Sequence, residues 1–305
     1  MYLSSYIRFI SRCISLTKMC CLFAIMLVYG FAQSQTDQVY FGSHTIHATQ
    51  LCKEEKFDAA MAQIELAIRD SVDSSDFFTW YSRGFIYKEV YKKRESENPE
   101  SKYREIAVHS FLKSRTLAGN ASEQTDNHDL ALKYLANTYY NDALQATLKI
   151  DQTNATIGAS HIERYCAIMQ AIHKAEECPA AFADYYRAKG QRFHELWSAD
   201  EKNKTLWDLA MSNYRRALEL AQHDCSISYN IVALYCNLLV TYRNNPELST
   251  QDTCLNMLRE AESGMAVAVH DCADEPTYAE LISQAQKLLV ELKAEFNTSN
   301  SPSKN

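Results

Sequence analysis

The sequence has very few of the residues that punctuate a polypeptide chain. Its 305 residues include only 7 glycines and 5 prolines, about 4% of the chain, where an average protein carries roughly 12%. Folds rich in β-structure use glycine and proline in their many turns, so this scarcity argues against them. Hydrophobic residues make up 47% of the chain, which is enough to bury a core and excludes disorder for most of it. The composition therefore predicts a nearly all-helical protein.

The sequence also lacks the common catalytic signatures. It contains no G-x-S-x-G, no H-E-x-x-H, no phosphate-binding glycine loop and no C-x-x-C. Its acidic residues fall on the polar faces of amphipathic segments, where any two of them can imitate an acid and base pair. We therefore predict no catalytic residues, no cofactor and no enzymatic activity.

The start of the chain has the pattern of an export signal. Three basic residues and no acid precede or border the apolar run at 19–32, and Ala32 and Ser34 fit a cleavage before Gln35. The run is shorter than the roughly 20 residues needed to span a bilayer, which disfavours a retained membrane anchor. We expect residues 1–34 to be a secretory signal peptide and the mature chain to be exported, to a periplasm or the extracellular space, with no integral membrane segment.

The mature chain is acidic and holds an odd number of cysteines. Removing the signal peptide leaves 28 bases against 38 acids, a net charge of −10. An acidic surface repels phosphate backbones and anionic lipid headgroups, so nucleic acids and membrane surfaces are not expected partners. An odd number of cysteines cannot all pair within one chain, and so few cannot form a disulfide scaffold. The seven that remain are Cys52, Cys166, Cys178, Cys225, Cys236, Cys254 and Cys272.

Two sequence patterns recur along the chain. One places a small residue between two bulky ones on a helix face, where a second helix can approach closely; its best copies put Gly84 and Gly190 at the small position. The other is an alanine followed four residues later by a bulky side chain. The first pattern occurs at 80–87, 132–139, 186–193 and 229–236, and the second at 57–70, 107–111, 210–218 and, more weakly, 254–261. The stretch 161–177 is helical in composition but does not fit the spacing.

These paired patterns resemble the tetratricopeptide repeat (TPR) family, whose unit is two antiparallel helices with the pattern W-x2-L-G-x2-Y, then A-x3-F, then a proline. Ala48 and Ala60 are 12 residues apart, as in the family. Later units are longer, with 23 residues from Gly84 to Ala107, and mostly lack the closing proline. The resemblance covers about residues 40–272 and implies an all-α, right-handed α-solenoid of about five degenerate helix pairs.

The end of the chain fits a helix that seals the stack. The segment 276–296 starts with a proline and carries an apolar stripe. We expect one helical domain over residues 35–296 and a disordered tail at 297–305. The stripe consists of Leu281, Ala285, Leu288, Leu289 and Leu292.

The resemblance also implies a binding surface. In the TPR family, ligand peptides lie on the concave face made by the first helix of each pair. Aromatic, amide and basic groups there suit a peptide, because amides can satisfy its backbone groups and bases can pair with a carboxylate. The expected groove residues are Tyr81, Phe85, Lys88, Lys133, Asn137, Tyr140, Asn141, Arg187, Gln191 and His194.

We therefore predict a non-catalytic scaffold that binds a protein or peptide partner. One alternative is a protein that captures a glycan or peptide ligand at a bacterial envelope, which would need exposed aromatic side chains clustered as flat platforms. Another is an enzyme, which would need a deep pocket holding a strongly perturbed carboxylate or histidine.

Two histidine patterns are candidate metal sites. His44 and His47 lie on adjacent turns, but two ligands without a third make a weak signal. The tripeptide His-Asp-Cys occurs at 223–225 and again at 270–272. It allows a zinc site from two histidines and two cysteines, a disulfide between the cysteines, or cysteines that simply fill the seam between repeats. We favour the seam and predict no metal, because we place both copies at the end of a second helix, and equivalent points of neighbouring repeats usually lie beyond the roughly 7 Å Cα separation that a disulfide allows.

Overall fold

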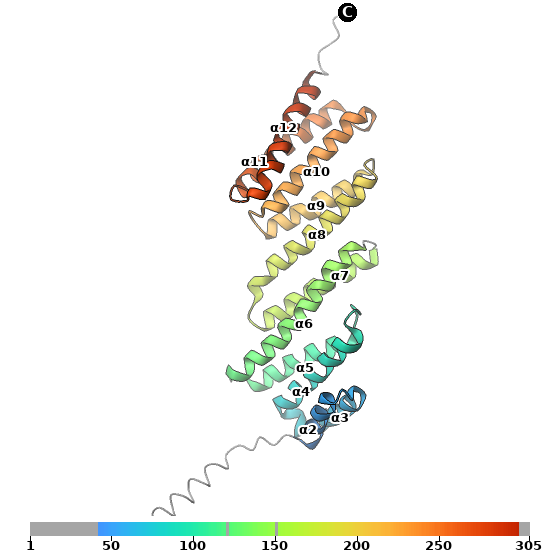
Figure 1. Ribbon diagram of the computed structural model, residues 1–305, viewed down its shortest axis with the longest axis vertical. Helices are drawn as coiled ribbons and strands as arrows, with labels where there is room; N and C mark the ends of the chain where they lie inside the picture. Colours follow the sequence, from blue (N-terminus) through green and yellow to red (C-terminus); the bar gives the residue numbers. More distant parts are fainter. Residues whose placement is uncertain (1–41, 120–121, 150–151, 299–305) are drawn as a thin grey trace, which may run out of the picture. The chain divides into compact units, whose positions relative to one another are not determined.

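The computed structural model describes residues 42–119, 122–149 and 152–298 (Figure 1). Within these residues every regular element is a helix, which confirms the all-α prediction. The helices are α2 (Ser43–Lys53), α3 (Phe57–Arg69), α4 (Phe77–Val90), α5 (Lys102–Ala118), α6 (Ser122–Leu148), α7 (Gln152–Ala171), α8 (Cys178–Ala199), α9 (Lys204–Leu220), α10 (Cys225–Asn244), α11 (Gln251–Asp271) and α12 (Pro276–Thr298). The expected signal peptide lies outside the described residues, as does the expected tail beyond residue 298.

The chain divides into two compact units, Met1–Thr79 and Trp80–Asn305. The described part of the first unit is built around the pair α2 and α3, which pack through the fully buried Ala48 and Ala60. These are the two small residues on which the first repeat was predicted. A buried hydrogen bond of 3.0 Å between the hydroxyls of Thr45 and Thr79 ties α2 to the end of the unit.

In the second unit each helix packs against its neighbours in the chain. α6 contacts α7 and α8, α8 contacts α9 and α10, and α10 contacts α11 and α12. The helices predicted to come first in each pair, α6, α8 and α10, therefore lie next to one another (Figure 1). Side-chain caps help to start three of the helices: Ser101 accepts a bond from the backbone of α5, Asp224 from that of α10 and Thr250 from that of α11.

Glycine is used where two helices cross. A Cβ placed on Gly84 would lie 2.9 Å from ring atoms of Phe111, and one on Gly190 would lie 2.8 Å from the ring of Tyr214. Phe111 and Tyr214 are both essentially buried. These contacts confirm that the small residue of the first pattern allows the bulky side chain of the second helix to pack against its backbone.

The same rule explains α7, which the sequence patterns left unassigned. Gly158 of α7 lies against the ring of Tyr185, where a Cβ would be 3.1 Å from the nearest ring atom. It lies 22 residues after Ala136, close to the spacing in the later units. Gly158 followed by Ile162 is thus a second-helix pattern with glycine in place of alanine. The sequence pattern did not identify this helix because it requires alanine at the small position, and because the helical stretch was taken to start at residue 161.

Among the described residues, three left-handed backbone turns use residues with side chains, whereas Gly119, with a φ of 64°, follows the end of α5. Glu55, His173 and His223 have φ between 57° and 66° and lie in the connections α2–α3, α7–α8 and α9–α10. Glycine is the usual residue in this conformation because it has no Cβ. The helix ends at these points therefore carry no glycine signal in the sequence.

A buried arginine of α5 joins the segment before that helix to α6. The side chain of Arg104 is fully buried, and its guanidinium donates to Asp142 Oδ2 at 2.6 Å, Thr138 Oγ1 at 3.2 Å and the carbonyl of Pro99 at 2.5 Å. The same group lies 3.8 Å from the ring centroid of Tyr139. A buried charge with this many partners resists separation, because losing one partner leaves the charge uncompensated.

The C-terminal helices share one core. α10 is the one helix among the described residues that is long and apolar enough to cross a membrane, and 67% of its most apolar window is buried in the fold. Helices α9, α11 and α12 cover it, so its hydrophobicity is accounted for by core packing. α12 packs against this core through Leu289 and Leu292 of the predicted stripe, but Ile282 is buried where Leu281, which is 39% exposed, was expected.

Candidate functional site

The ten residues predicted to line a groove lie on three helices. Tyr81, Phe85 and Lys88 are on α4; Lys133, Asn137, Tyr140 and Asn141 are on α6; Arg187, Gln191 and His194 are on α8. The predicted groove therefore follows the first helix of three successive pairs in the second unit.

Contacts between side chains join these helices into one row. The ammonium of Lys88 lies 6.0 Å from the ring centroid of Tyr134 on α6. The hydroxyl of Tyr140 donates to Asp184 Oδ2 of α8 at 2.7 Å. Burial, together with this hydrogen bond, raises the pKa of the Tyr140 hydroxyl. His194 of α8 lies 3.2 Å from the amide of Asn237 on α10.

Several charged groups of this row already pair within the protein. Lys133 Nζ lies 3.2 Å from Glu177, Arg187 lies 2.7 Å from Asp184, and Lys88 lies 2.8 Å from Glu89. The amides of Asn137, Asn141 and Gln191 are exposed, and Gln191 has only a long 3.5 Å contact to Glu195. The groups of the predicted set most open to a partner are therefore the amides.

Two open hollows lie on another part of the second unit, between α9 and α11. One has a volume of about 570 Å³ and the other about 510 Å³. Trp207, Met211 and Met257 give the first an apolar lining, and Arg215 and Glu260 stand at its edge, 3.7 Å apart. The prediction missed this surface because it is formed by second helices, whose outward faces it did not consider.

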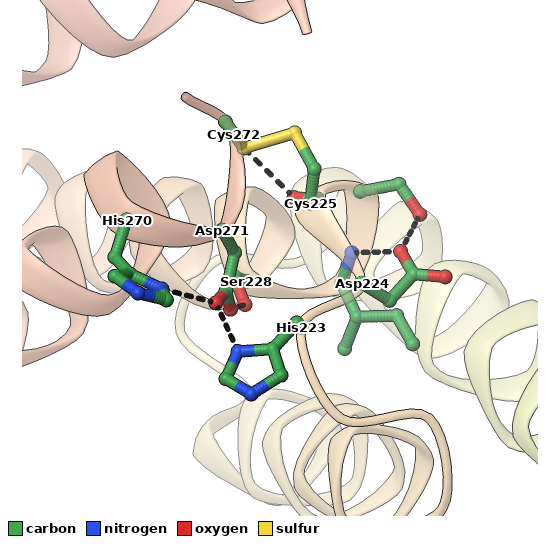
Figure 2. The surroundings of a disulfide bond; sticks show 9 residues. His223, Asp224, Cys225, Ser228, His270, Asp271 and Cys272 are labelled. Atoms are coloured by element: carbon green, nitrogen blue, oxygen red, sulfur yellow. Dashed lines mark hydrogen bonds and ion pairs between the residues drawn. A yellow bond between two sulfur atoms is a disulfide. The ribbon is translucent and has the colours of Figure 1, made fainter. Parts of the chain in front are cut away.

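The second hollow ends at the two His-Asp-Cys sequences, which the fold brings together (Figure 2). The carboxylate of Asp271 accepts from His223 Nδ1 at 2.9 Å and from His270 Nδ1 at 3.2 Å, both on Oδ1. Its other oxygen accepts from Ser228 Oγ at 2.5 Å. The Asp271 side chain is 2% exposed, whereas the two imidazoles are 70% and 75% exposed.

Opposing effects act on the pKa of Asp271. Burial acts to raise it, but the hydrogen bonds from Ser228, His223 and His270 together lower the pKa below its ordinary value. The carboxylate is therefore held in its charged form.

Cys225 and Cys272 form a disulfide, with Cα atoms 4.7 Å apart. The expectation that both cysteines merely fill a seam was wrong, and so was the assignment of Cys225 to the end of a helix. α9 ends at Leu220, so Cys225 is the first residue of α10, while Cys272 follows the last residue of α11. The start of one helix meets the end of its antiparallel neighbour, and the two positions are not equivalent points of successive repeats. The disulfide also rules out a zinc site made from these two cysteines.

Two other features singled out from the sequence are not part of this cluster. His44 Nδ1 donates to Gln63 Oε1 at 2.9 Å, and His44 lies on α2 with His47 in the first unit. Cys178 lies at the start of α8, and its thiol is 3.8 Å from the carbonyl of Cys166. Burial and the nearby Cys178 thiol raise the pKa of Cys166 to about 12.

Comparison with known proteins gives no assignment. No protein-family model matches the sequence, and none of the curated proteins compared with it matches.

Proposed function

We propose that this chain is a non-catalytic, TPR-like scaffold that binds a protein or peptide partner through the row of first helices α4, α6, α8 and α10. The observation that supports this best is the contact between successive first helices, through Tyr140 and Asp184 and through His194 and Asn237. A partner laid along this row would meet side chains from several pairs at once. We further propose that the pairs stack as a right-handed α-solenoid, as the resemblance to the TPR family implies.

The exposed amides give the row its chemistry. Asn137 and Asn141 are four residues apart, so they project from adjacent turns of one face of α6. Gln191 of α8 and Asn237 of α10 are exposed as well. Each amide offers both donors and an acceptor, which is what the backbone of an extended peptide requires.

The placement of aromatic side chains favours a peptide over a glycan. Of the described Trp, Tyr and Phe residues, only Tyr134 is exposed, at 40%. Trp197 and Trp207 are buried in the core, and Trp80 is half-buried. A glycan site built on flat aromatic platforms would need several such rings at the surface, so the envelope glycan-binding alternative has less support.

The disulfide supports the proposal that the mature chain is exported. Disulfides persist in oxidising compartments such as a periplasm or the extracellular space and are rare in reducing ones. Together with the basic and apolar segment at 1–34, the bond between Cys225 and Cys272 favours a periplasmic or extracellular site of action.

Site-specific crosslinking tests the proposal. A photoreactive amino acid is placed at Asn137 or Gln191 in the row, and at Gln286 on α12 as a matched exposed control. We expect the same envelope protein to be crosslinked from both row positions and not from the control. Combined substitution of Asn137, Asn141 and Gln191 by alanine should then abolish its capture. Equal crosslinking from the control, or capture unchanged by the triple substitution, would refute binding through this row.

A further inference from the structure

We propose that His223, His270 and Asp271 bind one divalent transition-metal ion of the zinc class, in a site held together by the Cys225–Cys272 disulfide. The three ligands are not among the residues predicted to line the groove, and they lie where α9, α10 and α11 meet (Figure 2). The proposed binding of a peptide does not depend on this site, whereas metal binding here would overturn the expectation, drawn from the sequence, that the chain binds no metal.

Two of the three separations between donor atoms match the spacing that zinc needs. All three residues offer ligand atoms within 4.8 Å of one another. Zinc–ligand bonds of about 2.0–2.1 Å in a tetrahedron place neighbouring ligand atoms roughly 3.3 Å apart. The distances from Asp271 Oδ1 to Nδ1 of His223 and of His270 are 2.9 and 3.2 Å. A metal therefore fits among these atoms with small movements of two exposed rings.

The chemistry of the set indicates which ions it would take. Two imidazoles and one carboxylate are a donor set that Zn²⁺ uses in proteins with a fourth position open to water. Imidazole nitrogen also suits Cu²⁺ and Ni²⁺, whereas Mg²⁺ and Ca²⁺ prefer oxygen ligands. The open hollow beside the histidines, which includes Leu218 and Val267, leaves room for that fourth ligand.

The surroundings orient the ligands before a metal arrives. Ser228 holds the second oxygen of Asp271 at 2.5 Å, so Oδ1 is turned toward the histidines. Hydrogen bonds of this kind orient metal ligands and strengthen binding. The carboxylate itself is buried, so its position is fixed by packing as well.

The disulfide joins the two halves of the site. Asp271 immediately precedes Cys272, and His223 lies two residues before Cys225. The bond therefore holds a ligand of the α9–α10 connection against two ligands at the end of α11. Breaking it would let the halves separate, so the affinity for metal should depend on the redox state of the two cysteines.

Metal titration of the oxidised chain, cleared of metal with a chelator, tests the site. Co²⁺ serves as the spectroscopic probe and Zn²⁺ as its competitor. We expect one equivalent of Co²⁺ to bind with the visible absorption of a tetrahedral ion and to be displaced by Zn²⁺. His223→Gln or His270→Gln should weaken binding by about tenfold or more, and Ser228→Ala by about tenfold. Both histidines are exposed, so these two variants should remain folded.

Two controls make the result decisive. His44→Gln with His47→Gln removes the other histidine pair and should leave the titration unchanged. Cys225→Ser with Cys272→Ser should weaken binding while circular dichroism verifies the helical content. The proposal is overturned if no stoichiometric metal binds, or if binding survives both His223→Gln and His270→Gln at full strength. Unchanged affinity in the cysteine variant would overturn the role given to the disulfide.

Discussion

Replacing Gly190 by alanine should destabilise the protein, although the same change usually strengthens a helix. The new Cβ would lie 2.8, 3.0 and 3.1 Å from three ring atoms of Tyr214. That ring is 1% exposed and so has little room to move. Gly264 of α11 provides a matched control, because its added Cβ would meet only Val232 at 3.5 Å and Ile231 at 3.9 Å, which are ordinary contacts.

The size of the effect follows from two opposing terms. Alanine is favoured over glycine inside a helix by about 1 kcal/mol. Forcing an extra carbon into a packed core costs about 1–3 kcal/mol, and the contact with a buried ring places Gly190 near the upper end. Gly190→Ala should therefore lower the free energy of unfolding by about 2 kcal/mol, whereas Gly264→Ala should raise it by about 1 kcal/mol.

Thermal unfolding of the two variants beside the unmodified chain measures this difference. A loss of about 2 kcal/mol corresponds to a Tm lower by roughly 4–8 °C for a domain of this size. Gly84→Ala, whose Cβ would lie 2.9 Å from the Phe111 ring, should behave like Gly190→Ala. If Gly190→Ala raises the Tm as Gly264→Ala does, glycine at the helix crossing is not required for packing and the assignment of these positions is wrong.

Three further predictions concern the disulfide, the buried arginine and a buried histidine. Replacing Cys225 and Cys272, which are 47 residues apart, by serine should lower the free energy of unfolding by up to about 4 kcal/mol, because the disulfide no longer restricts the unfolded chain. Urea unfolding with and without reductant measures this loss. Asp142→Ala should cost about 3 kcal/mol in the same assay, because it leaves the Arg104 guanidinium buried without its carboxylate; no loss would contradict the network. Burial lowers the pKa of His161 below 6.5, so stability should be complete above pH 6.5 and decrease as the pH falls through the lowered pKa, since the unfolded chain then binds the extra proton. His161→Gln should remove this part of the pH dependence, and an unchanged pH profile would contradict it.

The helices and their pairing could be predicted because the pattern of core residues is local. A small residue with bulky residues three or four positions away on either side marks the face of a helix that packs against a neighbour, and this pattern can be read from one short segment. Ala48 and Ala60, and Gly190 facing Tyr214, illustrate this. Among the described helices, α7 was recognised as helical in composition but left outside the pattern, and its small residue, Gly158, follows the same rule.

The disulfide could not be predicted because its geometry depends on where α9 ends and α10 begins. No glycine or proline lies between Leu220 and Cys225, so the sequence does not mark the residue at which one helix ends and the next begins. The break was expected after Cys225 and lies before it, so Cys225 was assigned to the wrong helix end and a partner 4.7 Å away in Cα distance was judged too distant.

That hidden break is also where the candidate metal site forms. The chain turns at His223, whose φ of 66° is a left-handed conformation that glycine adopts more easily. Glycine would make the same turn but could not place an imidazole nitrogen 2.9 Å from Asp271. His223 therefore both reverses the chain and supplies a ligand of the proposed site. A glycine at this position would leave the site without that ligand, so the scarcity of glycine that first indicated a helical protein also matters here.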